Sequence, residues 1–285
     1  MTIRRKALVA LFFMGLIPLL VRIVHADPLA IGVVRLTLAT SLTAFAFRNQ
    51  LSFSRSFIKK PGLFLSLGAL FAAHWFTYFL AIQSAGAALG FLALSTYGVH
   101  LTWLGAFFTS HRPGIIEWFC VFLAGAGAWC AAPSPTLEPE QALGFGIGLV
   151  SAILYALTPI LHQRNQDIPL YDRNLGQFSI ALLCFLPFSF FAEFPDSSKD
   201  WLILVVLGVC CTFIAHNLWI EVSSVLPPQV TGTIYYLALP MTLILEGLVL
   251  RKSPTQGELT GAALIIGGNL LAVSARGRQR RLAAA

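Results

Sequence analysis

The chain has 285 residues, of which 57% are hydrophobic and only 11% are charged, whereas soluble domains contain roughly 25% charged residues. With a mean hydropathy of +0.77, this composition excludes an ordinary soluble domain and predicts an all-α integral membrane protein. The charged residues lie between long apolar runs, so the net charge of +7 is useful for orienting the chain in a bilayer and predicts no nucleic-acid partner.

Ten apolar segments follow one another, separated by short polar breaks. A bilayer core of about 30 Å takes about 20 helical residues to cross, so we expect each segment to form one transmembrane helix. The longest break, 133–141, is polar and rich in proline, and we interpret it as a linker between two halves, 1–132 and 142–285. The expected helices are 7–24, 28–48, 61–82, 85–108, 114–132, 142–163, 173–193, 200–221, 225–249 and 255–275.

The first apolar segment has some features of a secretory signal peptide. Basic residues precede it, and Val24-His25-Ala26 resembles a small-residue cleavage site. However, the apolar run of 7–24 is longer than the usual hydrophobic region of a signal peptide, and an internal repeat includes it. We therefore expect this segment to remain as the first helix.

The two halves are similar to each other at an offset of 141 residues. Any one match at this offset is weak, but several at a single offset predict a unit of five helices that occurs twice. The matched positions are Pro18 with Pro159, Pro113 with Pro254, Glu117 with Glu258, and Gly127 with Gly268.

The basic residues predict the orientation of these helices. With the N-terminus in the cytoplasm, 14 basic residues flank the cytoplasmic ends and 4 flank the outer ends, so the positive-inside rule places both termini in the cytoplasm. Because five is an odd number, the second unit enters the membrane from the opposite side. Such inverted repeats are typical of secondary transporters, whose substrate site lies near the midplane between the repeats.

Polar and aromatic side chains gather in the stretch 74–103, which we expect to form two helices joined by a turn at Ser84-Ala85-Gly86. His74 and Tyr78 are four residues apart and Tyr97 and His100 three apart, so each pair shares one helix face. Two such faces would form an aromatic, hydrogen-bonding substrate site. The alternative is that these rings pack in the core or lie at the level of the lipid headgroups.

The second half contains similar residues, and the prediction extends to them. Aromatic side chains with polar tips suit an aromatic or zwitterionic ligand, and also a lipophilic cation. The predicted cavity-lining residues are His74, Trp75, Tyr78, Tyr97, His100, Tyr155, His216, Trp219 and Tyr235.

Three further residues lie within the expected helices. Pro18 and Pro159 are at equivalent positions of the two units, and we interpret them as paired hinge points, because proline permits a kink. Arg35 lies a third of the way into the second helix, where a charge is costly unless it faces the bundle. It could pair with a substrate carboxylate or have a structural partner, and the sequence leaves both open.

Motifs for catalysis and for metal binding are absent from the sequence. There is no H-E-x-x-H, no G-x-S-x-G and no nucleotide-binding loop. The five cysteines lie in apolar runs without metal-ligand spacing. We therefore expect no enzyme activity, no metal and no cofactor.

Taken together, the ten helices, the early Arg35 and the endings P-x-x-x-E-x-x-x-x-x-x-x-x-x-G at 113–127 and 254–268 resemble the drug/metabolite transporter superfamily, in its ten-helix exporter branch. Within that branch, the aromatic residues are similar to those of bacterial exporters of aromatic amino acids, which also handle methyl viologen. The sequence departs from many members at His111-Arg112 and Arg251-Lys252, where those members have a glutamate.

The resemblance implies a multi-pass protein of the bacterial inner membrane that exports aromatic and other neutral amino acids by alternating access. Its partners would be that small-molecule substrate and membrane lipids. Efflux of lipophilic cations such as methyl viologen is the alternative within transport. A membrane scaffold or lipid-binding protein that transports nothing is the alternative outside it.

Overall fold

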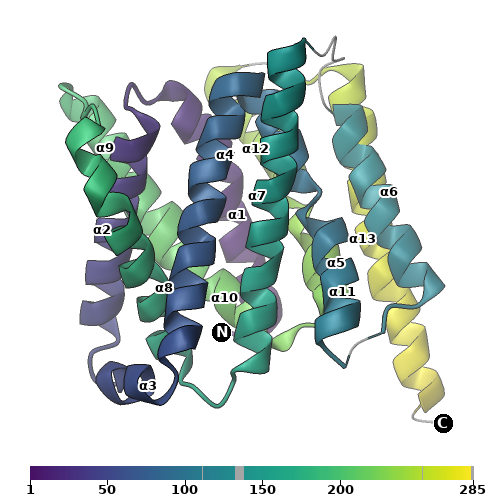
Figure 1. The fold of residues 1–285 in the computed structure, drawn as a ribbon. Helices are drawn as coiled ribbons and strands as arrows, with labels where there is room; N and C mark the ends of the chain where they lie inside the picture. Colours follow the sequence, from purple (N-terminus) through teal and green to yellow (C-terminus); the bar gives the residue numbers. More distant parts are fainter. Residues whose placement is uncertain (111, 132–137, 252, 284–285) are drawn as a thin grey trace. The chain divides into compact units, whose positions relative to one another are not determined.

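A computed structural model describes residues 1–110, 112–131, 138–251 and 253–283 (Figure 1). Within these ranges every regular element is a helix. The helices are α1 (Ile3–Ile23), α2 (Pro28–Ala46), α3 (Phe53–Lys59), α4 (Pro61–Ser95), α5 (Tyr97–Phe108), α6 (Ile115–Ala131), α7 (Pro139–Arg164), α8 (Leu170–Phe185), the 3₁₀ helix η1 (Leu186–Phe191), α9 (Ser198–Gly208), the π-helix η2 (Val209–Ile214), α10 (Ala215–Val225), α11 (Pro228–Tyr235), α12 (Ala238–Leu250) and α13 (Gln256–Ala283).

This structure supports the prediction of an all-helical, multi-pass membrane protein. Each of the ten expected segments overlaps a helix. Seven helical stretches in the described residues are long and apolar enough to cross a bilayer, and the apolar helix Ile115–Cys130 is shorter. These seven stretches are Pro28–Ala46, Pro61–Ala85, Gly90–Phe108, Pro139–Arg164, Leu170–Phe191, Ser198–Val225 and Pro228–Val249.

The chain reverses its direction inside α4. The element α4 spans Pro61–Ser95, although we expected a turn at Ser84-Ala85-Gly86 to separate two helices. A Cβ atom built on Gly90 would nevertheless lie only 3.2 Å from the backbone nitrogen of Ile82. In a straight helix these positions would be about 12 Å apart. The reversal therefore occurs close to the expected turn, while the helix boundary lies later, at Thr96.

The chain forms two compact units. Unit 1 consists of Met1–Phe79 and Leu157–Val225, and unit 2 consists of Leu80–Ala156 and Leu226–Ala285. Each unit takes helices from both halves of the sequence, so the compact units divide the chain differently from the predicted repeat.

In unit 1, α2 packs against α8 and α9. Two residues stabilise the N-terminus of α2: Asp27 accepts a hydrogen bond from the backbone N–H of Leu29, and Pro28 occupies the first turn. Glycines then allow close helix contacts. A Cβ atom on Gly68 would collide with Ile180, and one on Gly208 would collide with Leu38. Gly68 and Gly208 are separated by the 141-residue offset to within one residue, and so are Leu38 and Ile180.

In unit 2, α6 and α13 lie side by side (Figure 1). A Cβ atom on Gly127 would lie 2.6 Å from the carbonyl oxygen of Gly261, and one on Gly268 would lie 3.1 Å from that of Cys120. Gly127 and Gly268 are 141 residues apart, and so are Cys120 and Gly261, so the two contacts correspond to each other at the offset of the predicted repeat. The two helices therefore contact each other reciprocally, as two equivalent elements do across a two-fold axis.

A second close approach in unit 2 joins α5 to α11. A Cβ atom on Gly232 would lie 2.6 Å from the carbonyl oxygen of Gly98, and one on Gly98 would lie 2.7 Å from that of Gly232. Backbone therefore meets backbone at this crossing. This leaves no room for a side chain on either residue.

The short helix α3 is held to α8 in unit 1 by a buried carboxylate. Asp172 accepts hydrogen bonds from the backbone N–H of Ser52 at 2.9 Å, from its hydroxyl at 2.8 Å and from the hydroxyl of Ser56. Nearby, the exposed Asp167 pairs with Lys60 at 2.8 Å and with Lys59 at 3.2 Å. Hydrogen bonds from these two lysines lower the pKa of Asp167.

We expect Asp172→Ala to destabilise the protein more than Asp167→Ala. Hydrogen bonds to a buried charged group contribute strongly, and losing three of them should cost about 2 kcal/mol or more, while exposed ion pairs contribute little. The measurement is the apparent melting temperature of the purified protein in detergent. Equal melting temperatures for the two variants would contradict the anchoring role of Asp172.

The small contribution of Asp167 to the stability of the fold depends on pH. Because the pKa of Asp167 is lowered on folding, this contribution is present above the pKa of an unfolded aspartate and is lost as the pH falls through the lowered value.

Candidate functional site

Four of the predicted site residues come together in unit 1. The helix α4 contributes Phe71, His74, Trp75 and Tyr78, and α10 contributes His216. The ring of Phe71 lies 5.0 Å from that of Trp75 and 5.3 Å from that of His216, measured between ring centroids. Trp75 and His216 are 6.3 Å apart, and His74 and Tyr78 are 6.2 Å apart. We call these five residues the aromatic cluster.

The side chain of Arg35 lies against this cluster. It projects from α2, is only 3% exposed, and places its guanidinium carbon 4.3 Å from the ring centroid of Trp75. Its Nε donates a hydrogen bond to the hydroxyl of Thr212 at 2.9 Å. That hydroxyl in turn donates to the carbonyl oxygen of Leu207, also at 2.9 Å. A cation is therefore held beside the aromatic rings by a neutral hydroxyl.

Thr212 belongs to the π-helix η2, which interrupts the helical stretch from α9 to α10. Such π turns are rare and occur often at functional sites. Here the turn lets the hydroxyl reach the carbonyl five residues earlier and present its oxygen to Arg35. The π turn thus orients the hydroxyl that holds the guanidinium of Arg35.

Arg35 has no ionic partner in the part of the chain that the structure describes. Ion pairs there join Lys6 to Glu221, His25 to Asp200, and Lys59 and Lys60 to Asp167. A buried charge without a counter-charge is costly, above all at membrane depth. Arg35 is therefore an unusual buried group that a purely structural role leaves unexplained.

Two residues of this site were not among the sequence predictions. Phe71 lies one turn before Trp75, and Thr212 lies one turn before His216. Both could have been found by extending the predicted helix faces by four residues, although an isolated Phe or Thr in an apolar helix usually has a packing role.

A polar network lies on neighbouring helices, where Asn174 donates a hydrogen bond to Asn217 at 2.7 Å and Asn217 donates one to Thr43 at 3.1 Å.

Three other predicted residues come together in unit 2. Tyr97 on α5 lies 4.5 Å from Tyr235 on α11 and 4.7 Å from Tyr155 on α7, and Tyr155 and Tyr235 are 6.0 Å apart. Tyr97 and Tyr155 are buried. We call these three residues the tyrosine cluster.

Four predicted residues lie outside the two clusters. His100 is half-buried on α5, and its Nε2 has no hydrogen-bond partner among the described residues. Trp219 is buried on α10, one turn after His216. Pro18 lies within α1 and Pro159 within α7. The roles of all four residues remain predictions.

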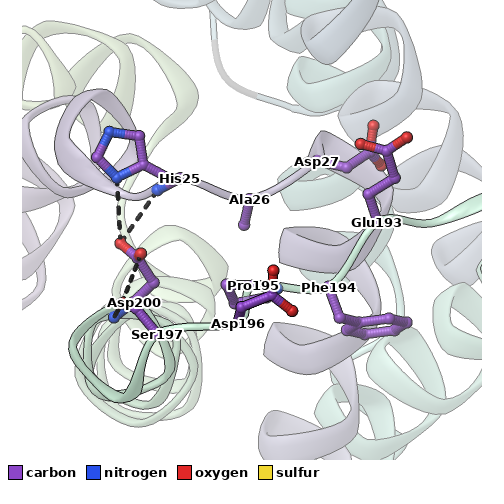
Figure 2. A pocket seen from close by; sticks show the side chains of 9 residues that line it. All are labelled: His25, Ala26, Asp27, Glu193, Phe194, Pro195, Asp196, Ser197 and Asp200. Carbon is purple, nitrogen blue, oxygen red and sulfur yellow. Dashed lines mark hydrogen bonds and ion pairs between the residues drawn. The ribbon is translucent and has the colours of Figure 1, made fainter.

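A pocket of about 420 Å³ lies in unit 1, between the start of α2 and the start of α9, and Figure 2 shows the side chains that line it. It is rich in carboxylates, and two of these have structural roles: Asp27 begins α2, and Asp200 accepts hydrogen bonds from the backbone of His25 and from Ser197. Within the described ranges, no group of three or more His, Cys, Asp or Glu residues is arranged to hold a metal ion. The lining residues are His25, Ala26, Asp27, Glu193, Phe194, Pro195, Asp196, Ser197 and Asp200.

Comparisons with known proteins agree with a membrane transporter. Residues 142–274 match the EamA-like transporter family. A protein of Bacillus subtilis (strain 168) named "Uncharacterized transporter YxxF" is 21% identical over 216 residues, covering 74% of this chain and 70% of that protein. One solved crystal structure has a TM-score of 0.84 at 18% identity, covering 96% of this chain and 97% of the other. That structure shows a shared fold.

Proposed function

We propose that the protein is a secondary transporter that exports aromatic and other neutral amino acids by alternating access. The observation that carries this proposal is the aromatic cluster of unit 1, in which buried histidines and aromatic rings lie beside a buried cation. Rings of this kind stack on an aromatic side chain and offer hydrogen bonds to the polar end of an amino acid. The tyrosine cluster of unit 2 is a second proposed group of substrate-contacting rings.

Ten transmembrane helices in two inverted five-helix repeats, 1–132 and 142–285, form the proposed architecture. The reciprocal contacts of Gly127 with Gly261 and of Gly268 with Cys120 support it, because equivalent elements related by a two-fold axis contact each other in this way. Inverted repeats allow two mirror-related arrangements, one open to each side of the membrane. In this proposal Pro18 and Pro159 are the bending points.

The proposed location is the bacterial inner membrane, with both termini in the cytoplasm. Its support is the excess of basic residues on one set of helix ends. Labelling of single cysteines introduced near the two termini, in intact and in opened cells, tests this orientation.

Efflux of lipophilic cations such as methyl viologen is the second candidate, since aromatic rings also attract cations. Arg35 argues against it. Its guanidinium already lies 4.3 Å from the ring of Trp75, and its positive charge repels a second cation in a site of low dielectric constant. A neutral or zwitterionic substrate avoids most of this repulsion. A scaffold that transports nothing would leave the buried cation without a role.

The proposal predicts that Tyr78→Ala and Tyr97→Ala each reduce phenylalanine transport by about tenfold or more, as expected when a ring that contacts substrate is removed. Phe76 on α4 and Trp103 on α5 are exposed, so Phe76→Ala and Trp103→Ala are the matched controls and should transport like the unmodified protein. The measurement is uptake into proteoliposomes that contain equal amounts of each variant. Unchanged transport by both tyrosine variants would show that neither cluster contacts the substrate.

A further inference from the structure

We propose that Arg35 binds the carboxylate of the transported substrate, so that the site selects aromatic compounds that carry a carboxylate. This inference rests on the proposed transport function and specifies which substrate group is recognised. It starts from a buried guanidinium that has no carboxylate partner among the described residues.

The geometry leaves the binding end of the guanidinium available. The one hydrogen bond that Arg35 forms with described residues is made by Nε, at 2.9 Å from the hydroxyl of Thr212. The two terminal nitrogens form the fork that binds a carboxylate with two parallel hydrogen bonds. Since Thr212 is itself held by the carbonyl of Leu207, the orientation of the fork is prepared before a ligand arrives.

The surroundings of Arg35 favour an anionic group that comes from outside the protein. Its neighbours Trp75, Thr212, Cys211 and Tyr78 are groups that carry no negative charge at neutral pH. A buried cation among such groups has lost its hydration without gaining a counter-charge. A substrate carboxylate supplies that counter-charge, while the adjacent ring of Trp75 contacts the aromatic part of the same molecule.

The structural alternative is that Arg35 satisfies the carbonyl groups at a helix end. The hydrogen bond of Nε goes to a side-chain hydroxyl instead. By contrast, Arg173 shows the structural pattern in the same unit, because it donates to the backbone carbonyls of Ile168 and His162. Arg35 therefore differs from an arginine that stabilises a helix end.

Only the first half of the chain has an arginine at this position of the predicted repeat. At the 141-residue offset, Arg35 corresponds to Gly176, where a Cβ atom would collide with the ring of Phe64. The equivalent place in the second half is thus filled by an aromatic ring. This difference between the halves fits the recognition of one carboxylate in each protein molecule.

The test compares three ligands that share a phenyl ring: L-phenylalanine, 3-phenylpropionate, which lacks the amino group, and phenethylamine, which lacks the carboxylate. Binding is measured as the ligand-induced rise in melting temperature of purified protein, since a ligand that binds the folded state stabilises it. Transport of radiolabelled phenylalanine is measured in parallel. The variants are Arg35→Gln and Arg35→Lys, and the control is Arg48→Gln, because Arg48 is an exposed arginine just beyond the same helix.

The unmodified protein and Arg48→Gln should bind the two carboxylates about 10- to 100-fold more tightly than phenethylamine, which is the range expected for hydrogen bonds to a charged group. Arg35→Gln should abolish this preference, and Arg35→Lys should keep only part of it because lysine lacks the fork. If the unmodified protein transports phenylalanine and Arg35→Gln keeps the preference, the role of Arg35 is wrong and the transport function stands. If the unmodified protein neither binds nor transports phenylalanine, both proposals are wrong.

Discussion

Gly232→Ala is expected to reduce the amount of folded protein sharply. The added Cβ atom would lie 2.6 Å from the carbonyl oxygen of Gly98 and 3.0 Å from its Cα. Backbone atoms cannot move aside as a flexible side chain can, so α5 and α11 would have to separate. Overpacking of this kind costs about 1–3 kcal/mol and sometimes more. The loss would be measured as a lower melting temperature and as a smaller monodisperse peak in size-exclusion chromatography.

Gly146→Ala is the matched control for this prediction. It makes the same chemical change on α7 of the same unit, and nothing lies within 4 Å of the added Cβ atom. Since glycine is about 1 kcal/mol worse than alanine inside a helix, this variant should be as stable as the unmodified protein or slightly more stable. A Gly232→Ala protein as stable as Gly146→Ala would show that α5 and α11 do not cross as described.

Trp75→Ala is expected to abolish transport and also to lower stability. The indole ring contacts Phe71 at 5.0 Å and Phe79 at 6.1 Å between ring centroids, and it covers the guanidinium of Arg35 at 4.3 Å. Removing a buried tryptophan side chain costs about 3–5 kcal/mol. Because stability and function would fall together, this variant alone does not separate them.

Trp75→Phe separates the two effects. Phenylalanine keeps most of the packing but has a smaller ring and a weaker interaction with cations, so the protein should fold while its transport rate decreases. Trp129 on α6 is exposed, and Trp129→Ala is the control that should change neither property. Normal transport by Trp75→Phe and Trp75→Ala would exclude Trp75 from the substrate site.

Much of the fold could be predicted from hydropathy, because a long apolar run in a membrane protein has few alternatives to a helix. Helix boundaries were less accurate where the backbone departs from a simple helix. The chain reverses between Ile82 and Gly90, inside the span Pro61–Ser95 of α4 and not at its end. The π turn around Thr212 has no pattern in the sequence that distinguishes it from an α-helix.

The candidate site was predictable where one helix provides several members of a cluster. His74, Trp75 and Tyr78 share a face of α4, and spacing alone indicates this. Contacts between distant helices were not predictable, because a single sequence contains no pairing information. The approach of Thr212 to Arg35 joins residues 177 positions apart, and the two compact units mix both halves of the chain.

A counterflow assay provides the decisive test of amino-acid transport by this protein. Proteoliposomes containing the purified protein are loaded with unlabelled phenylalanine, and uptake of radiolabelled phenylalanine or tryptophan is followed with and without a proton gradient. We expect uptake that requires the preloaded amino acid, and the response of this uptake to the gradient distinguishes a facilitator from a proton-coupled exporter. No amino-acid uptake in either condition, with methyl viologen transported instead, would contradict amino-acid export and assign the protein to the efflux of lipophilic cations.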